Sequence, residues 1–209
     1  MVVRGGTPLW IRALRVVFAV VGIVALVWIP LRNLDNPDYS YLNFFSYFTI
    51  QSNLIGIVVL LVGGLRDPGG RRWELVRGAA TLYLTITLII YAVLLSDIDV
   101  QLTEKWINDI LHRLIPIVLI ADWLLVLAPG IKPTVKLVLG WLAFPLAYGL
   151  YVLIRGPFAD WYPYPFIDPR EQGYGSLTIG LAVMAVVFAI LGVIVAAVTG
   201  VVPRAVARR

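Results

Sequence analysis

Residues 175–200 read GSLTIGLAVMAVVFAILGVIVAAVTG and carry no charged side chain in 26 positions. A helix needs about 20 predominantly apolar residues to cross the hydrocarbon core of a bilayer. A run of this length without charge is typical of a transmembrane helix, because a helix on the surface of a soluble protein keeps polar residues on its outer face. The segment therefore predicts that this chain folds in a membrane.

Five earlier segments have the same character, and each is bounded by charged residues, Pro or Gly. The six predicted spans cover residues 13–31, 43–63, 75–95, 107–128, 134–154 and 175–200. Only 14% of the 209 residues are charged, whereas a soluble domain has about a quarter. We therefore expect an all-α fold, with one integral membrane domain over residues 1–209 that forms a bundle of six transmembrane helices. This composition excludes a secreted enzyme, a nucleic-acid-binding protein and a multidomain receptor.

The distribution of Lys and Arg predicts the orientation of this bundle. Twelve basic residues fall on the side of the two termini and four on the other side, and basic residues favour the cytoplasmic side. Both termini should then be cytoplasmic in a multi-pass protein of the plasma membrane. The longest loop, 155–174, should lie outside, where its Trp and Tyr residues suit an anchor at the level of the lipid headgroups.

The residue inventory restricts the possible chemistry. The chain has no Cys and a single His, which excludes disulfides, thiolate metal sites and metal sites made of several His residues. We expect no metal and no cofactor. The expected partners are the bilayer itself and a lipid or fatty-acyl ester, and we expect no binding to nucleic acid.

Two polar residues are predicted at the same depth on different helices. Thr49 lies about six residues inside the second span and His112 about six residues inside the fourth, counted from the outer ends. At a rise of about 1.5 Å per residue, both lie roughly 9 Å below those ends. A hydroxyl needs a neighbouring base to act as a nucleophile, and neutral imidazole suits that role. The pair therefore predicts an acyl-transfer dyad, with Thr49 as the nucleophile and His112 as the base.

Further polar residues are predicted around this dyad. Ser46 and Asn53 share one helix face with Thr49, and Tyr91 reaches the same depth from the third span. Each of the three is a candidate hydrogen-bond donor to an oxyanion.

Two acidic residues are candidates for orienting the imidazole. Asp109 precedes His112 by three residues, which brings its carboxylate within reach of the ring on a regular helix. Asp122 lies ten residues beyond His112 and is the second candidate. Pro116 removes a backbone donor one turn below His112, which opens the helix there.

Other interpretations stay open on the residues alone. A Thr in a membrane helix commonly bonds its own i−4 carbonyl or a neighbouring helix, and a buried His often makes a purely structural hydrogen bond. Alternatively, His112, Arg113 and Asp122 line a polar pathway in a non-enzymatic transporter, proton relay or lipid-binding protein. Transporters often contain repeated halves, and this chain has no internal repeat, which makes this alternative the weaker one.

Three segments occur together in one family of membrane proteins. They are Phe48-Thr49-Ile50-Gln51, His112-Arg113-Leu114-Ile115-Pro116 and Trp161-Tyr162-Pro163-Tyr164-Pro165-Phe166-Ile167-Asp168. By their order and spacing, the chain resembles the androgen-induced and androgen-dependent TFPI-regulating family, and more closely its bacterial six-span relatives. The resemblance extends from the first span to the sixth. It implies a threonine hydrolase that cleaves fatty acid esters of hydroxy fatty acids, with Thr49 and His112 as the catalytic pair.

The sequence departs from the animal members of that family at two places. These are the polar run Gln51-Ser52-Asn53 and Arg113 directly after the histidine. Both differences leave Thr49 and His112 in place, but the identity of the substrate stays open. The leading hypothesis is a membrane-embedded lipid ester hydrolase whose substrate enters from the outer leaflet. Arg113, Arg155 and Arg32 are the candidates for binding a carboxylate of that substrate.

Overall fold

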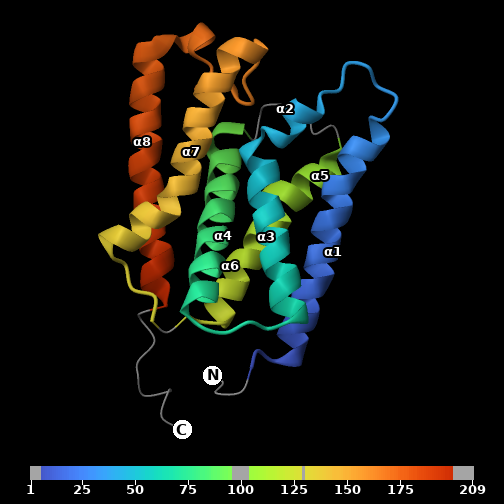
Figure 1. Ribbon diagram of the computed structural model, residues 1–209, viewed down its shortest axis with the longest axis vertical. Coiled ribbons are helices and arrows are strands. Elements are labelled where there is room, and N and C mark those ends of the chain that lie inside the picture. The colour runs from blue at the N-terminus through green and yellow to red at the C-terminus, as the bar shows by residue number, and fades with distance from the viewer. Residues whose placement is uncertain (1–5, 96–103, 129, 200–209) are drawn as a thin grey trace.

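The computed structural model describes residues 6–95, 104–128 and 130–199, and helices joined by loops make up this part of the chain (Figure 1). The long helices are α1 (Leu9–Arg32), α3 (Phe48–Leu65), α4 (Arg71–Ile90), α7 (Val135–Ala159) and α8 (Pro169–Val198). The short elements are α2 (Tyr41–Phe45), η1 (Tyr91–Leu95), α5 (Lys105–Asp109), η2 (Ile110–Leu114), α6 (Ile115–Leu125) and η3 (Pro165–Ile167). The turns η1 and η2 are π-helical, and η3 is a 3₁₀ turn.

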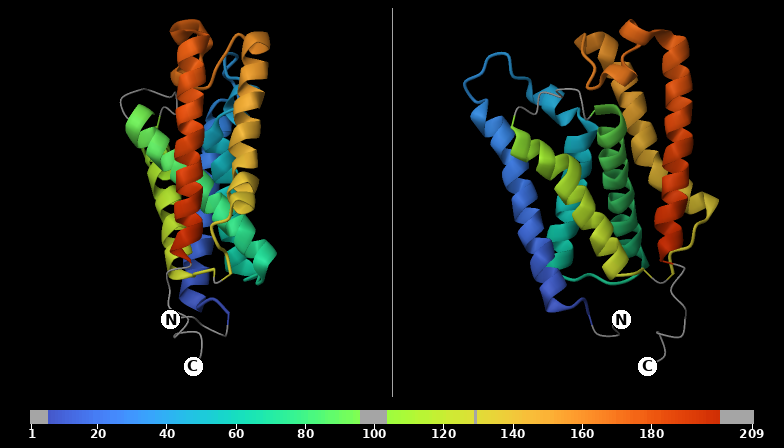
Figure 2. Two further views of the ribbon diagram at one scale, coloured as in Figure 1. Left: turned by 90° about the vertical axis from the view of Figure 1, so that its left-hand side faces the viewer. Right: turned by 180° about the vertical axis from the view of Figure 1, so that it is seen from behind.

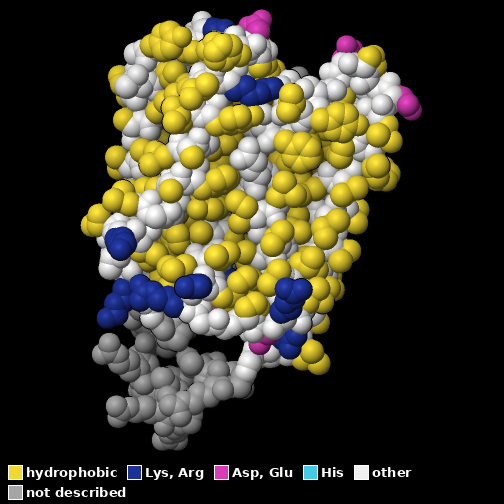
Figure 3. All heavy atoms as spheres, in the orientation of Figure 1, with side chains coloured by type: hydrophobic (Ala, Val, Ile, Leu, Met, Phe, Trp, Pro, Cys, Tyr) yellow, Lys and Arg dark blue, Asp and Glu magenta, His cyan; other side chains and the backbone are white. Residues whose placement is uncertain are grey.

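Five of these helices are long and apolar enough to cross a membrane: α1, α3, α4 together with η1, α7 and α8. Apolar side chains cover most of the visible face of the bundle between its two ends (Figure 3). A soluble protein does not expose apolar surface on this scale. The chain is therefore a helical, multi-pass membrane protein.

The sixth predicted span, 107–128, is a bent series of α5, η2 and α6. These three pieces follow one another without a gap from Lys105 to Leu125, but each piece alone is shorter than a membrane span. The π-helical turn η2 and Pro116, which has no backbone N–H to donate, lie within this series. The count of six spans therefore stays a prediction.

The helices run up and down along one common direction, with α6 inclined behind α3 and α4 (Figures 1 and 2). The start of α1 and the end of α8 lie at the same end of the bundle. Helix α3 packs between α1 and α4, while α7 and α8 pack against each other beside α4. Gly64 permits the close approach of α3 to α1, because a Cβ atom there would lie 2.8 Å from the backbone oxygen of Arg12.

The second predicted span is not one continuous helix, and this corrects the expectation for 43–63. Helix α2 ends at Phe45, and α3 begins at Phe48 after a break at Ser46 and Tyr47. Thr49 is consequently the second residue of α3 rather than six residues inside a long helix. Ser46 lies outside α3, so it does not share a helical face with Thr49 and Asn53.

A buried ionic cluster joins three helices at the end of the bundle where α1 begins. Asp122 of α6 accepts a hydrogen bond from Arg15 Nε of α1 at 2.6 Å and one from Arg77 Nη2 of α4 at 2.9 Å. All three side chains are less than 10% exposed, and Glu74 adds a second carboxylate 2.6 Å from Arg77. Both carboxylate oxygens of Asp122 are therefore engaged by arginines, and the expectation that Asp122 is a candidate for orienting His112 is wrong.

Candidate functional site

Thr49 lies in the first turn of α3, where backbone N–H groups have no partner within the helix. Two tyrosines from the far end of the sequence accept these hydrogen bonds. The N–H of Phe48 donates to the hydroxyl of Tyr148 at 3.2 Å, and the N–H of Thr49 donates to the hydroxyl of Tyr164 at 3.3 Å. These contacts fix the start of α3, and with it the buried side chain of Thr49.

The hydroxyl of Thr49 contacts the imidazole of His112 directly. The distance from Thr49 Oγ1 to His112 Nε2 is 3.1 Å, although the two residues are 63 positions apart in the chain. The other ring nitrogen, Nδ1, lies 3.3 Å from the backbone oxygen of Asn108. A carbonyl oxygen only accepts hydrogen bonds, so this contact favours the tautomer with its proton on Nδ1 and a free lone pair on Nε2. The predicted proximity of Thr49 and His112 is confirmed, while their catalytic roles stay a prediction.

The π-helical turn η2 links His112 to the helix that carries Thr49. In this turn the N–H of Ile115 bonds the oxygen of Ile110, and residue 116 is a Pro without an N–H. The backbone oxygen of Leu111 therefore has no regular helical donor, and the side-chain amide of Asn53 donates to it at 2.9 Å. The same amide donates to the backbone oxygen of Thr49 at 2.8 Å. Asn53 thus clamps α3 against η2 one turn below the dyad.

The ring of His112 is held by Asn108 and Tyr91 rather than by an acid. Tyr91 stacks on the imidazole, and its hydroxyl accepts a hydrogen bond from the side chain of Asn108 at 2.6 Å. Asp109 instead pairs with Lys105 at 3.0 Å and with Arg113 at 2.6 Å on the exposed side of the helix. The expectation that Asp109 orients His112 is therefore wrong. Lys105 and Arg113, four residues before and after Asp109, bind its carboxylate on the exposed side of the helix.

The loop between α7 and α8 folds into the bundle. The expectation was a loop over residues 155–174 whose aromatic side chains lie at the level of the lipid headgroups. The loop is shorter than expected, since α7 continues to Ala159 and α8 begins at Pro169. Tyr164 is only 5% exposed, and its hydroxyl lies 3.4 Å from Thr49 Oγ1. Sequence reasoning missed this contact. The signal available was the placement of Tyr164 between Pro163 and Pro165, which restricts the backbone on both sides.

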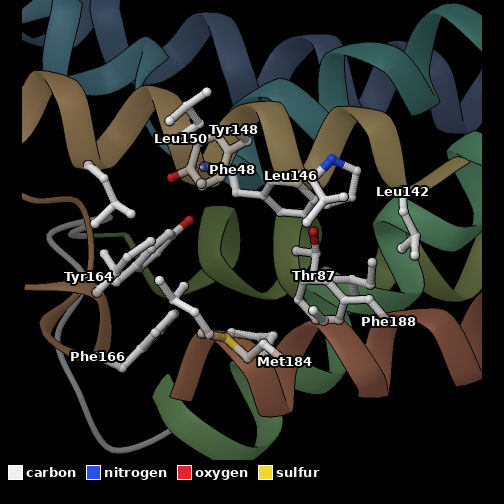
Figure 4. A pocket seen from close by; sticks show the side chains of 18 of the residues that line it. Phe48, Thr87, Leu142, Leu146, Tyr148, Leu150, Tyr164, Phe166, Met184 and Phe188 are labelled. Atoms are coloured by element: carbon white, nitrogen blue, oxygen red, sulfur yellow. Dashed lines mark hydrogen bonds between the residues drawn. The ribbon is translucent and has the colours of Figure 1, made fainter. Parts of the chain in front are cut away.

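An apolar pocket of about 280 Å³ begins at Thr49 and Tyr164 and extends between α4, α7 and α8 (Figure 4). Its walls include Ile86 of α4, Leu142 and Leu146 of α7 and Phe188 of α8. Leu146 is 54% exposed, so this wall also belongs to the outer surface of the bundle. The pocket therefore joins the buried hydroxyl of Thr49 to space suited to a hydrocarbon chain.

The predicted oxyanion donors do not contact the Thr49 hydroxyl in the described part of the chain. The hydroxyl of Ser46 donates to the backbone oxygen of Leu42 at 2.6 Å, and both described bonds of the Asn53 amide go to backbone oxygens. The hydroxyl of Tyr91 accepts a hydrogen bond from the side chain of Asn108. None of these three groups has a hydrogen bond to Thr49 Oγ1 in the described part of the chain.

The predicted carboxylate-binding arginines differ in their partners. Arg32 pairs with Glu104 at 2.6 Å, and Arg113 pairs with Asp109. Arg155 has no acidic partner among the described residues, and it donates to the neutral side chain of Asn43 at 2.6 Å. Its guanidinium also lies over the ring of Trp161, 5.3 Å from the ring centroid. Of the three arginines, Arg155 is thus the one whose charge is not paired with an acidic side chain among the described residues, so it is the best placed to bind a carboxylate.

Within the described ranges, no group of three or more metal-ligating side chains gathers in one place. Comparisons of this chain with models of protein families, with curated proteins and with solved structures give no match. The geometry of the site is therefore the basis on which a function has to be argued.

Proposed function

We propose that this protein is a membrane-embedded lipid ester hydrolase in which Thr49 is the nucleophile and His112 the general base. The observation that carries the proposal is the 3.1 Å contact between Thr49 Oγ1 and His112 Nε2 at the end of an apolar pocket. A base must lie within hydrogen-bond reach of the proton that it removes. The contact of Nδ1 with the Asn108 carbonyl supports the tautomer that can do so.

The reaction follows the usual two steps of acyl transfer. Thr49 Oγ1 attacks the carbonyl carbon of the ester while His112 Nε2 takes the Thr49 proton, and the π electron pair of the carbonyl moves onto the carbonyl oxygen. When the carbonyl re-forms, the alcohol leaves with the proton held by His112, and the acyl group stays on Thr49. A water molecule then attacks this acyl-threonine and loses its proton to His112. The bond between the acyl carbon and Thr49 Oγ1 breaks, His112 returns the proton to Oγ1, and the fatty acid is released.

The pocket and its surroundings suggest the class of substrate. The lining beyond Thr49 is almost wholly apolar, which suits the acyl chain of a lipid. Arg155, without an acidic partner among the described residues, suits a carboxylate on the same molecule. These features agree with a fatty acid ester of a hydroxy fatty acid, and we propose membership of the androgen-induced and androgen-dependent TFPI-regulating family on the three motifs together.

The finer membrane topology also belongs to this proposal. We infer six spans in the plasma membrane, with α5, η2 and α6 together as the fourth and both termini cytoplasmic. Lys and Arg gather at the end of the bundle where α1 begins, while Asp and Glu lie mainly at the opposite end, beside further basic side chains (Figure 3). This pattern is typical of a cytoplasmic end. The dyad, at the opposite end of α3, would then face the outer leaflet.

The alternative of a polar transport pathway finds less support in the described residues. Its three members do not line one path, because Asp122 belongs to the ionic cluster with Arg15 and Arg77. Arg113 points to the exposed side of its helix, where it pairs with Asp109. His112 is left with Thr49, Asn108 and the ring of Tyr91 as its neighbours.

The test is covalent labelling of the purified full-length protein in detergent with a fluorophosphonate, together with hydrolysis of a p-nitrophenyl fatty acid ester. Wild type should be labelled and should hydrolyse the ester, and Thr49→Val should do neither, because it keeps the shape of the side chain and loses the nucleophile. The matched control is Thr85→Val, since the Thr85 hydroxyl bonds only the backbone oxygen of Thr81 within the described chain. Labelling of Thr49→Val at the wild-type level would overturn the assignment of the nucleophile.

A further inference from the structure

The hydroxyl of Tyr164 occupies a position that the proposed reaction has not used. It lies 3.4 Å from Thr49 Oγ1 and 3.3 Å from Thr49 N, and its ring lines the apolar pocket. The hydroxyl is therefore beside both the nucleophilic atom and the space that a substrate would fill. Figure 4 shows the hydroxyl of Tyr164 directed into that space, on the side of Phe48 and Tyr148.

The directions of the surrounding hydrogen bonds leave the proton of Tyr164 available. The backbone N–H of Thr49 can only donate, so the Tyr164 oxygen accepts that bond. The acceptor that the structure offers to the Tyr164 proton is Thr49 Oγ1, at 3.4 Å. This distance is long for a bond between two hydroxyls, which usually measure about 2.7–2.8 Å. The proton is thus weakly engaged in the substrate-free protein.

We propose that Tyr164 is a catalytic residue whose O–H donates a hydrogen bond to the oxyanion of the tetrahedral intermediate, an inference that rests on the proposed hydrolase function. As Thr49 Oγ1 bonds to the carbonyl carbon of the ester, the π electron pair moves onto the carbonyl oxygen, which becomes the oxyanion. The Tyr164 proton turns from Thr49 Oγ1 to this oxygen and stays covalently on Tyr164. When the Tyr164 O–H turns away from Thr49 Oγ1, a lone pair on that oxygen becomes free for the attack on the ester.

The fold holds this donor in place before substrate binds. The ring of Tyr164 stacks on Phe166, with centroids 5.1 Å apart, and meets Tyr47 edge-on at 5.7 Å. Asp168, at the end of the same loop, caps the first turn of α8 and binds Arg170. A donor that needs no rearrangement stabilises developing charge better than mobile water does. Burial raises the pKa of Tyr164, so the phenol also keeps its proton at neutral pH.

Two neighbouring hydroxyls, those of Tyr148 and Ser46, are less suited to this role because their protons are committed. Tyr148 donates to the backbone oxygen of Ser46 at 2.9 Å, a normal hydrogen-bond length. The hydroxyl of Ser46 donates to Leu42, as described above. Tyr164 therefore combines three properties: contact with the nucleophile, a place in the pocket wall and a proton without a strong acceptor.

The test compares Tyr164→Phe with wild type in ester hydrolysis and in binding of a fatty-acyl trifluoromethyl ketone, which forms a tetrahedral adduct with the nucleophile. Loss of one oxyanion donor lowers kcat by about 10²–10³-fold in other enzymes, and we expect a fall of that order with KM little changed. Affinity for the ketone should fall by a similar factor, because an analogue of the transition state makes the same hydrogen bond. The substitution keeps the aromatic packing but removes the acceptor of the Thr49 N–H, so we expect a small fall in the thermal unfolding midpoint, and kinetics and ketone binding are compared well below that midpoint.

The matched control is Tyr151→Phe, which removes a phenol hydroxyl that bonds Ser46 at 2.7 Å and does not touch Thr49. It should leave kcat and ketone affinity unchanged. An active Tyr164→Phe protein with wild-type kcat would overturn the role of Tyr164 while leaving the hydrolase proposal standing. A fall in kcat with wild-type ketone affinity would also overturn it, because the effect would then be structural. If wild type neither hydrolyses the ester nor binds the ketone, the proposed function itself fails.

Discussion

The ring of Tyr91 stacks on the imidazole of His112, with centroids 4.4 Å apart and ring planes inclined by 24°. The hydroxyl of Tyr91 also accepts a hydrogen bond from Asn108, the residue whose backbone oxygen holds His112 Nδ1. One aromatic residue thus fixes both the plane of the imidazole and the residue that selects its tautomer. In the proposed hydrolase, this arrangement would take the place of the carboxylate that orients the histidine in many such enzymes.

The stacking predicts a graded effect of substitutions at Tyr91. Tyr91→Leu should lower kcat by roughly 10–100-fold, because a misplacement of about 1 Å in a catalytic group can cost 10²-fold. Tyr91→Phe keeps the stacked ring and loses only the bond to Asn108, so it should retain most activity. Steady-state kinetics on the two variants checks this, and equal losses in both would show that the hydroxyl rather than the ring positions His112.

Asp109 should be dispensable for turnover. Its carboxylate pairs with Lys105 and Arg113 and has no described contact with His112, so Asp109→Asn should leave kcat close to the wild-type value. The same kinetic assay measures this, with His112→Ala as the variant that should remove most turnover. A loss in Asp109→Asn comparable to that in His112→Ala would restore the carboxylate to the mechanism.

Hydrolysis should decrease as the pH falls through the pKa of His112. Protonated imidazolium has no lone pair on Nε2, so it cannot accept the proton of Thr49. We expect a single acidic limb in the rate, because one histidine must lose its proton before it can act as the base. The thermal unfolding midpoint, measured across the same pH series, separates this effect from acid denaturation. A rate that stays constant while His112 becomes protonated would argue against a base at this position.

Removing Asp122 should destabilise the protein strongly. Asp122→Ala leaves Arg15 and Arg77 buried without their shared carboxylate, and breaking a buried ion pair in this way costs about 3–5 kcal/mol. A lowered thermal unfolding midpoint in detergent is the measurement. Asp109→Ala is the matched control, since it removes an ion-paired carboxylate from the exposed surface and should have little effect. Equal midpoints for the two variants would show that the cluster contributes nothing.

The orientation can be tested with single cysteines, because the natural chain contains none. Ala159→Cys lies at the exposed end of α7 and should react with a membrane-impermeant thiol reagent in intact cells. Gly69→Cys lies in the exposed loop between α3 and α4, at the end where Lys and Arg gather, and should react only after the cells are opened. The reverse pattern would invert the predicted topology.

Two features could be predicted from the sequence: that the protein spans a membrane, and that Thr49 and His112 lie close together. The first depends on the composition of short segments, and the second on how far each residue lies from the outer end of its helix. The uncharged run in α8 is sufficient to indicate a span, whatever packs against it. Thr49 and His112 were expected to meet because each lies a similar distance from an outer helix end. This comparison of positions correctly predicted the contact between Thr49 and His112, although α3 begins later than expected. The break at Ser46 and Tyr47 changes where the helix starts, but it leaves Thr49 near the same end of the bundle.

The remaining details depend on contacts between distant segments. The break at Ser46 and Tyr47 is stabilised by Tyr148 and Tyr164, which lie about a hundred residues further along the chain. The i, i+3 spacing favoured Asp109 as the partner of His112, but the π-helical turn η2 changes the positions of side chains around it. The inward fold of Tyr164 could not be read from a loop of aromatic residues, because the same composition suits a membrane interface.

The wall formed by Leu146 and Leu150, both more than half exposed on α7, has a kinetic consequence. A ligand that reaches Thr49 past these side chains arrives from the hydrocarbon phase, where its concentration is set by partitioning rather than by the amount dissolved in water. The relevant KM is then a mole fraction in the surrounding lipid or micelle. Adding inert detergent at constant total ester would slow turnover by surface dilution, and changing the aqueous volume alone would not.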